Sequence, residues 1–251
     1  PLDQYSNLYT VRSNILIPER QLLHIREDLA VPPSMNGMKR MFEAGKLGII
    51  QNVGYPNQNR SHFRSMEIWS TGSSSEESLQ TGWLGRYFEA EHPSFPSGYP
   101  NTQFTDPFAI SMGAFASETC QGTVSNFSIS LQDPFSLHPI NQGAEDGTYG
   151  PYYSEELDFL RTTITQTNRY AARITLASER GRNTVDYPDY KLAQELRNIA
   201  LLLAGGLQTR IFIVSLGGFD THASQVVNGD PIRGAHQELL KILSESISVF
   251  Q

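Results

Sequence analysis

The stretch RIFIVSLGGFDTH, from Arg210 to His222, decides the fold class of this chain. Its first half is a continuous run of apolar and partly β-branched residues, which is typical of a strand buried on both faces of a parallel sheet. Two glycines, Gly217 and Gly218, then allow the backbone to turn sharply and leave room for a ligand. The stretch therefore predicts a buried parallel strand that ends in a polar loop.

Amphipathic helices and further short strands lie on both sides of this stretch in the sequence. A stripe of apolar residues at helical spacing predicts a core-facing helix over about residues 187–204, with Gly205 and Gly206 at its end. Similar patterns predict helices at residues 35–44, 61–72, 82–91 and 152–180 and in the last stretch from residue 236. The residues expected to face inward are Phe63, Met66 and either Ile68 or Trp69; Trp83, Leu84, Tyr87 and Phe88; Leu192, Leu196, Ile199, Ala200 and Leu203; and Leu239, Leu240, Leu243, Ile247 and Phe250.

Three more apolar segments read as strands: LGIIQNV at residues 47–53, PFAISM at 107–112 and VSNFSISL at 124–131. Helices that alternate with short apolar strands predict an α/β fold, with a largely parallel sheet flanked by helices on both faces. We expect one domain over residues 1–251, with a loop-rich excursion at about 90–150. Its proline-rich and aromatic part, His92 to Pro107, is a candidate partner surface.

Composition narrows the classes of function. A net charge of −7 and a single cysteine, Cys120, argue against a nucleic-acid surface, an internal disulfide and a multi-thiolate metal site. A metal ion would therefore be held by His, Asp and Glu. No apolar run approaches the length of a transmembrane segment. Both ends of the chain stop abruptly within their patterns, so we expect the sequence to be truncated at both ends.

Asp220 and His222 are the first candidate site residues. They are one residue apart in the loop after the predicted strand, and ligands gather beyond the carboxyl ends of strands in α/β folds. A carboxylate and an imidazole together suit a divalent ion such as zinc. The alternative is that Asp220 caps the next turn and His222 is an ordinary loop residue. His236, in the following helix, is either a further ligand or a structural histidine.

The stretch NRSH, Asn59 to His62, holds the second group of candidates, at the expected start of a helix. A serine there is an ordinary N-cap. The same position places the Ser61 hydroxyl among the unpaired N–H groups of the helix N-terminus, which favour an anionic substrate. Arg60, and less so Arg64, offers donors for that anion. Asn59 is a further candidate for the pocket wall, although turn formation also explains it.

Taken together, YPNQNRSHFRSMEIWSTG, TGWLGRY, LGGFDTHASQ and the helix from His236 resemble the bacterial domain-of-unknown-function family 1501. Members of that family are similar in fold to the alkaline phosphatase and sulfatase superfamily. The resemblance covers essentially the whole chain. It implies an export signal in the full-length protein, and so a periplasmic or secreted location. Two family elements are missing here, a GGNDGLN-like turn near the N-terminus and a Thr-Asp-His-Gly-like motif near the C-terminus.

The resemblance also implies roles for the candidate residues. Ser61 matches the nucleophile position, with His62 beside it as a ligand or base. Asp220 and His222 match a metal-binding pair, although such a pair is usually further apart in the catalytic members, which leaves His236 as an alternative partner. The implied cofactor is a divalent ion: zinc, manganese or calcium.

The sequence therefore leaves two candidate functions from different classes. The first is a metal-dependent hydrolase of phosphate or sulfate esters, in which a small anionic ester is the substrate, Ser61 attacks and Arg60 orients. The second is a non-catalytic binding or scaffold protein of the cell envelope on the same fold, for which a protein partner stays open. The hypothesis of a metal-free Ser/His hydrolase is weaker than both, because no glycine flanks Ser61 to form a nucleophile elbow.

Overall fold

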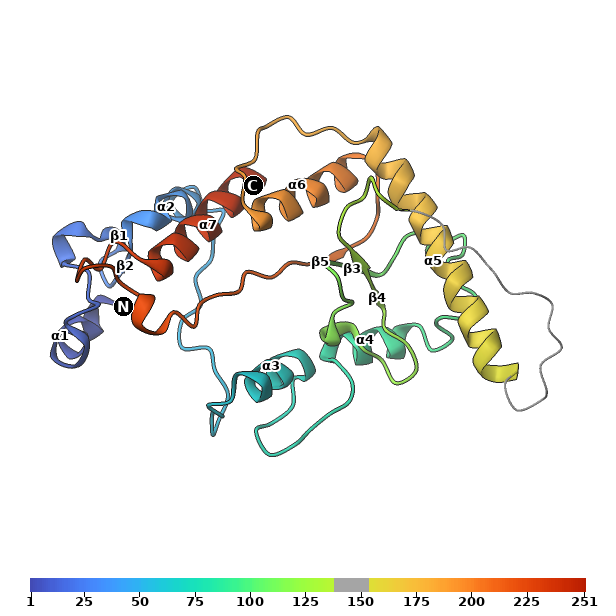
Figure 1. The fold of residues 1–251 in the computed structure, drawn as a ribbon, viewed down its shortest axis with the longest axis horizontal. Helices are drawn as coiled ribbons and strands as arrows, with labels where there is room; N and C mark the ends of the chain where they lie inside the picture. The colour runs from blue at the N-terminus through green and yellow to red at the C-terminus, as the bar shows by residue number, and fades with distance from the viewer. Residues whose placement is uncertain (138–153) are drawn as a thin grey trace. The chain divides into compact units, whose positions relative to one another are not determined.

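In the computed structural model, the chain is built around a parallel sheet. The structure describes residues 1–137 and 154–251, and in helix α5 (Ser154–Arg180) it describes the side chains from residue 164 onward. Strand β3 (Ala109–Met112) lies between β4 (Ser128–Leu131) and β5 (Ile211–Ile213), and both pairings are parallel (Figure 1). All four residues of β3 are buried. The mixed α/β architecture with helices flanking a parallel sheet is thus confirmed.

The described chain divides into two compact units. The first unit comprises residues 1–51, 184–197 and 215–251, and the second comprises residues 52–183 and 198–214. Each unit is described by itself. The expectation of a single domain over the whole chain stays a prediction, and residues 138–150 of the expected excursion lie outside the described residues.

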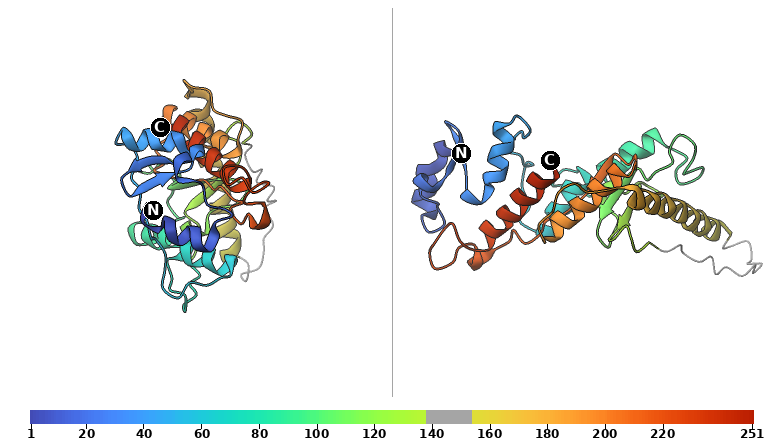
Figure 2. Two further views of the ribbon diagram at one scale, coloured as in Figure 1. Left: turned by 90° about the vertical axis from the view of Figure 1, so that its left-hand side faces the viewer. Right: turned by 90° about the horizontal axis from the view of Figure 1, so that it is seen from above.

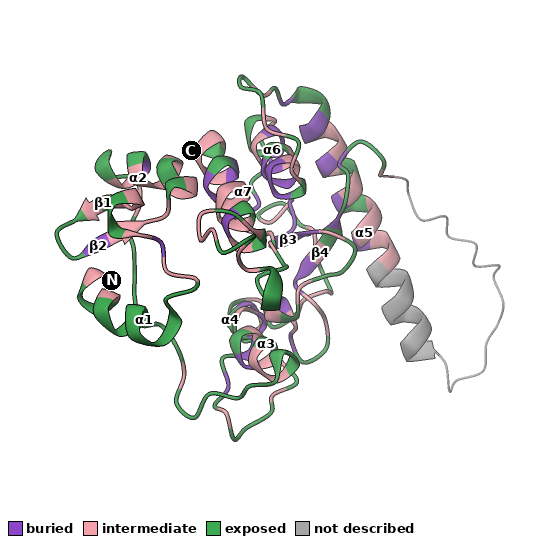
Figure 3. Cartoon of the chain, turned by 60° about the vertical axis from the view of Figure 1, so that its left-hand side comes forward, coloured by how far each residue is buried: buried purple, intermediate pink, exposed green. Residues whose placement is uncertain are grey.

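Aromatic residues and the sheet build the core of the second unit. Phe88, Ala109, Cys120 and Phe127 form a buried cluster, against which side chains from the strands and from α4 (Trp83–Glu91) pack. Figure 3 shows buried residues gathered along β3 and β4. Helix α3 (His62–Thr71) buries Ile68 and Thr71, and Gly72 ends it in the left-handed conformation, as the sequence predicts.

Glycines allow close contacts at two helix ends of the second unit. A Cβ on Gly85 of α4 would lie 2.0 Å from the carbonyl oxygen of Gln121, so no larger residue fits there. The ends of α5 (Ser154–Arg180) and α6 (Lys191–Ala204) meet in the same way (Figure 2). A Cβ on Gly181 would lie 2.0 Å from the Leu201 oxygen, and one on Gly205 would lie 1.9 Å from the Ala177 oxygen. Helix α5 confirms its prediction over the described residues, and α6 confirms its own from Lys191 onward, whereas residues 187–190 are not helical.

Short elements and two packed helices form the first unit. Its N-terminal part holds α1 (Tyr5–Arg12), the antiparallel pair β1 (Leu23–Arg26) and β2 (Leu29–Val31), and α2 (Asn36–Glu43). Helix α7 (Ala235–Phe250) packs on α2 through small residues, and the Met38 amide donates to the Ser244 hydroxyl at 3.2 Å. A Cβ on Gly37 would lie 2.2 Å from the Ser248 hydroxyl oxygen. Over the described residues, the 3₁₀ turns are Leu2–Gln4, Glu19–Gln21, Pro33–Met35 and His222–Ser224 in this unit and Glu118–Cys120 in the second unit.

Several inward positions were predicted incorrectly. In α3, Phe63 and Met66 are 88% and 68% exposed, and of the two alternatives Ile68 and Trp69 it is Ile68 that is buried. In α4, Trp83 and Tyr87 are exposed while Phe88 is buried, and in α6 Leu203 is exposed while Leu192, Leu196 and Ile199 are buried as predicted. In α7 the buried residues are Gln237, which accepts a hydrogen bond from the Ser34 hydroxyl, Ser244, which contacts α2, and Ser246. The predicted residues are half-buried, and Phe250 is exposed.

The predicted strand LGIIQNV is wrong. Residues 47–53 form no strand, and Ile50 is 86% exposed. A strand is defined by its hydrogen bonds to a neighbour, and none of the described strands pairs with this segment. Where the structure is described, no helix has the length and apolar character needed to cross a membrane.

Candidate functional site

Ser61 is the N-cap of α3, as the sequence predicts. Its hydroxyl oxygen accepts a long hydrogen bond of 3.4 Å from the Arg64 amide. Both Ser61 and His62, the first helical residue, are exposed. The hydroxyl therefore sits at the positive end of a ten-residue helix within reach of solvent, which is the position that an anionic group prefers.

A local network fixes the loop that leads to Ser61. The hydroxyl of Tyr55 lies 2.7 Å from that of Ser65, which in turn donates to the Asn59 carbonyl at 2.9 Å. The side-chain oxygen of Asn59 accepts from the Ser61 amide at 2.8 Å. Asn59 thus positions the backbone at Ser61 through this oxygen.

The two arginines of this segment differ in what they contact. Arg64 forms an ion pair of 2.7 Å with Glu67 and donates to the carbonyl oxygens of Ser74, Ser75 and Glu77, so it fastens the following loop. Arg60 is exposed, and its side chain forms no hydrogen bond or ion pair with the residues that the structure describes. The Arg60 guanidinium therefore faces solvent, whereas that of Arg64 is bound to protein groups.

Asp220 and His222 contact each other in the first unit. Asp220 Oδ2 and His222 Nε2 are 2.8 Å apart, and the side chains are 51% and 80% exposed. His222 has a positive φ of 44°, an uncommon conformation for histidine. The two side chains lie on the same side of the loop, as the sequence predicts for residues that are separated by one other residue.

His236 lies in the first turn of α7, close to the same loop. Its ring meets that of Phe219 edge to face, with the ring centroids 6.3 Å apart. Phe219 directly precedes Asp220, so one residue connects His236 to the Asp220–His222 pair. Among the described residues, no three His, Cys, Asp or Glu side chains are grouped closely enough to hold a metal ion.

The candidate residues thus fall into two groups. Asn59, Arg60, Ser61 and His62 belong to the second unit, whereas Asp220, His222 and His236 belong to the first. Within each group the structure brings the residues together. Each group has its own chemistry: a hydroxyl at a helix N-terminus in one, and a carboxylate beside an imidazole in the other.

Cys120 is not a candidate nucleophile. The thiol is fully buried, and burial raises its pKa to about 11, with only partial compensation from the Ser128 hydroxyl. A thiol with such a pKa stays protonated at neutral pH, whereas the thiolate is the reactive form.

A buried carboxylate that the sequence analysis did not single out is Asp106. It accepts hydrogen bonds from Arg173 Nε at 2.6 Å, from the Gln208 amide at 2.7 Å and from the Thr105 hydroxyl at 3.0 Å. Burial alone would raise its pKa, but these hydrogen bonds outweigh burial and hold the pKa below its ordinary value. Asp106 thereby ties the segments that lead into β3 and β5 to α5.

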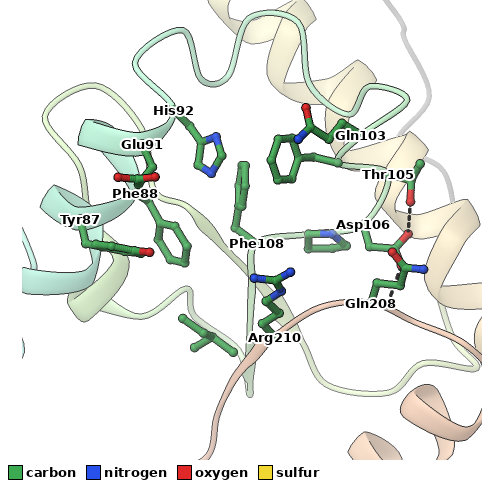
Figure 4. Close-up of a pocket in the computed structure, with 13 residues that line it drawn as sticks. Tyr87, Phe88, Glu91, His92, Gln103, Thr105, Asp106, Phe108, Gln208 and Arg210 are labelled. Carbon is green, nitrogen blue, oxygen red and sulfur yellow. Dashed lines mark hydrogen bonds between the residues drawn. The ribbon is translucent and has the colours of Figure 1, made fainter.

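An aromatic cavity of about 480 Å³ opens beside Asp106, at the amino ends of β3 and β5 (Figure 4). Its walls come from α4, from residues 92 and 103–108 of the proline-rich excursion, and from residues 208–211. The density of aromatic residues in the excursion was the one sequence signal for it. The sequence does not show that these rings face one cavity, because this depends on the long-range contact of residues 208–211 with the excursion.

No known protein family, curated protein or solved structure matches this chain. The resemblance drawn from its motifs is therefore a proposal, and so is the alkaline phosphatase-like classification of its fold.

Proposed function

We propose that this chain carries the working residues of a metal-dependent hydrolase of phosphate or sulfate esters, on an alkaline phosphatase-like fold and in an extracytoplasmic protein. The observation that carries the proposal is the convergence of Asp220 Oδ2 and His222 Nε2 at 2.8 Å. Two neighbouring ligands of one zinc ion, bound at about 2.0–2.2 Å, lie roughly 3.4 Å apart in a tetrahedral site. A small opening of the pair would admit the ion.

The donor set fits a borderline-soft divalent ion, since it combines one carboxylate oxygen with one imidazole nitrogen. Asp220 and His222 would hold the ion, with His236 as the candidate for a further ligand. When bound, the metal neutralises the anionic ester and polarises its oxygens. Zinc fits this set best; manganese and calcium prefer more oxygen ligands.

Ser61 would act as the nucleophile. Its hydroxyl oxygen forms a bond to phosphorus or sulfur, while the bond to the alcohol oxygen of the substrate breaks and that oxygen leaves with the electron pair. His62 takes the proton of the hydroxyl, and the departing alcohol takes a proton from water. A water molecule then attacks the phosphorus or sulfur, the bond to the Ser61 oxygen breaks, phosphate or sulfate leaves, and His62 returns its proton to the Ser61 oxygen. Arg60 orients the anion with its forked donors.

The first test measures metal by plasma mass spectrometry in the full-length protein purified without chelator. The variant is Asp220→Ala, and Asp28→Ala is the matched control, because Asp28 is also exposed and paired with a basic side chain. We expect near-stoichiometric zinc in the wild type and in Asp28→Ala, and its loss in Asp220→Ala. Metal-free protein that also fails to bind added zinc, manganese or calcium would contradict the proposal.

The second test measures release of p-nitrophenol from its phosphate and sulfate esters. Ser61→Ala should abolish turnover while leaving bound metal unchanged. Ser117→Ala is the control, because Ser117 also caps a helical turn with its hydroxyl. Equal activity of the wild type and Ser61→Ala would remove Ser61 from the mechanism.

A binding protein of the cell envelope is the second candidate function. The aromatic cavity favours it, because that cavity lies at the amino ends of the strands and contains none of the candidate hydrolase residues. Stable metal content without any ester hydrolysis would favour this candidate.

A further inference from the structure

The aromatic cavity has the size of a small-molecule site. Its volume of about 480 Å³ falls within the range of roughly 300–1,000 Å³ that is usual for ligand pockets. All of its lining residues belong to the second unit, so the cavity is formed within that unit.

Packed rings form the apolar part of the wall. Phe108 lies between Phe88, at a centroid distance of 5.4 Å, and the His92 ring, at 4.3 Å. Phe88 is buried, and His92 Nδ1 is 3.1 Å from the Tyr99 hydroxyl, which fixes the imidazole. The rings therefore hold their positions before any ligand arrives, and such pre-organisation lowers the entropy lost on binding.

Planar polar groups surround these rings. Figure 4 shows the Arg210 guanidinium pointing toward the rings of Phe88 and Phe108, with Glu91 to one side and the amides of Gln103 and Gln208 to the other. Among the residues that the structure describes, none forms a hydrogen bond or ion pair with the side chain of any of these four. Each group offers two hydrogen-bonding atoms in one plane, and together they include donors and acceptors.

The charges of the cavity balance. Glu91 and Arg210 contribute one charge of each sign, and the charge of Asp106 is compensated by Arg173 outside the lining. The Glu91 carboxylate would repel an anionic ligand, and the Arg210 guanidinium would repel a cationic one. Charge complementarity therefore favours a neutral ligand with many hydroxyl groups.

We propose that this cavity binds a ring of a neutral carbohydrate. The weakly polar C–H face of a pyranose packs on aromatic rings. Pairs of neighbouring hydroxyl groups each match a planar side chain with two hydrogen-bonding atoms, as Glu91, Gln103, Gln208 and Arg210 provide. The exposed Tyr87, at the mouth of the cavity, extends the aromatic surface for a second ring. This site needs neither metal nor Ser61, so it stands independently of the proposed hydrolase.

Saturation-transfer difference NMR on the full-length protein tests the proposal. The probes are maltotriose, cellotriose, mannotriose and xylotriose, with benzoate as an anionic aromatic compound, and the dissociation constant of the strongest binder is measured by titration. The variants are Tyr87→Ala and Arg210→Ala. Trp83→Ala controls for an exposed aromatic residue on the same helix outside the cavity, and Arg20→Ala controls for an exposed arginine elsewhere.

We expect at least one trisaccharide to bind, with affinity about tenfold lower in each cavity variant and unchanged in each control, as loss of one ring contact or one bidentate hydrogen bond implies. Circular dichroism checks that every variant is folded. The proposal is wrong if no trisaccharide binds, if only benzoate binds, or if the cavity variants bind as tightly as the controls.

Discussion

Asp106 and Asp220 both stand near an end of a strand, yet they are held differently. Asp106, before β3, is 7% exposed and accepts three hydrogen bonds from three separate segments. The Asp220 side chain, in the loop after β5, is 51% exposed and contacts a histidine two residues away. The carboxylate at the amino ends is thus part of the packed structure, whereas the one in the loop is half exposed to solvent.

The same contrast holds for the neighbouring side chains. The rings of the aromatic cavity are fixed by other rings, while Ser61 and His222 are held by local contacts within a few residues. A site built from packed side chains is formed before its ligand binds. A site built from exposed loop residues gains its final geometry from the ligand, so its contribution to folding stability is small.

The largest difference should come from removing each carboxylate. Asp106→Ala leaves the Arg173 guanidinium and the Gln208 amide without their acceptor, and we expect it to lower the free energy of unfolding by about 3 kcal/mol. Asp220→Ala should change it by less than about 0.5 kcal/mol, as is usual for exposed sites. Urea denaturation followed by circular dichroism measures both. Equal losses of unfolding free energy in the two variants would show that Asp106 contributes no more to the packed structure than Asp220 does.

The close contact of α4 should show a slightly smaller effect. Gly85→Ala places a Cβ 2.0 Å from the Gln121 carbonyl oxygen, which a backbone shift must relieve, and we expect a loss of about 2 kcal/mol in unfolding free energy. Gly48→Ala is the control, because a Cβ there meets no atom within 4 Å. Unfolding in urea compares the two. If Gly85→Ala is as stable as Gly48→Ala, then α4 does not lie as close to the Gln121 backbone as the structure shows.

The two carboxylates should also differ in how stability depends on pH. The pKa of Asp106 is lower in the folded chain than in the unfolded one, because its hydrogen bonds from Arg173, Gln208 and Thr105 outweigh burial. Its contribution is therefore fully present above the unfolded pKa of about 3.9 and is lost as the pH falls through the folded pKa. The stability difference between wild type and Asp106→Asn should shrink below about pH 4, measured by urea denaturation at several pH values. A difference that stays constant down to pH 2 would contradict the ionic role of Asp106.

Sequence periodicity predicted the elements well and their buried faces less well. The apolar runs at 107–112, 124–131 and 210–216 gave the three parallel strands, and the glycine signals gave the ends of α3 and α6. The run at 47–53 has the same composition but no strand pairs with it, and composition does not reveal a missing neighbour. The exposed Phe63 and the buried Ser244 likewise depend on which helix packs against which.

The candidate residues divide along the same line. Local sequence sufficed for the Ser61 cap and for the contact of Asp220 with His222, since both involve residues at most three positions apart. It did not suffice for Asp106 or Arg210, because their surroundings come from segments up to about a hundred residues away in the chain. Contacts of that kind are set by tertiary packing, which a single sequence does not display.

Substitutions at Ser61 should have the smallest effect on stability, and they separate its role as a helix cap from its proposed role as a nucleophile. The hydrogen bond from the Arg64 amide is long and exposed, so Ser61→Ala should lower the free energy of unfolding by only about 0.5 kcal/mol, at the weak end of N-cap effects. Ser61→Asp retains a capping oxygen and adds a negative charge that the helix N-terminus favours, so its stability should match or exceed that of the wild type. A nucleophile, by contrast, tolerates neither change. Thermal unfolding and ester hydrolysis, measured on the same three proteins, therefore separate the cap from the catalyst. Activity that follows stability across the series would make Ser61 a cap alone, and activity lost in both variants despite near-native stability is what a nucleophile requires.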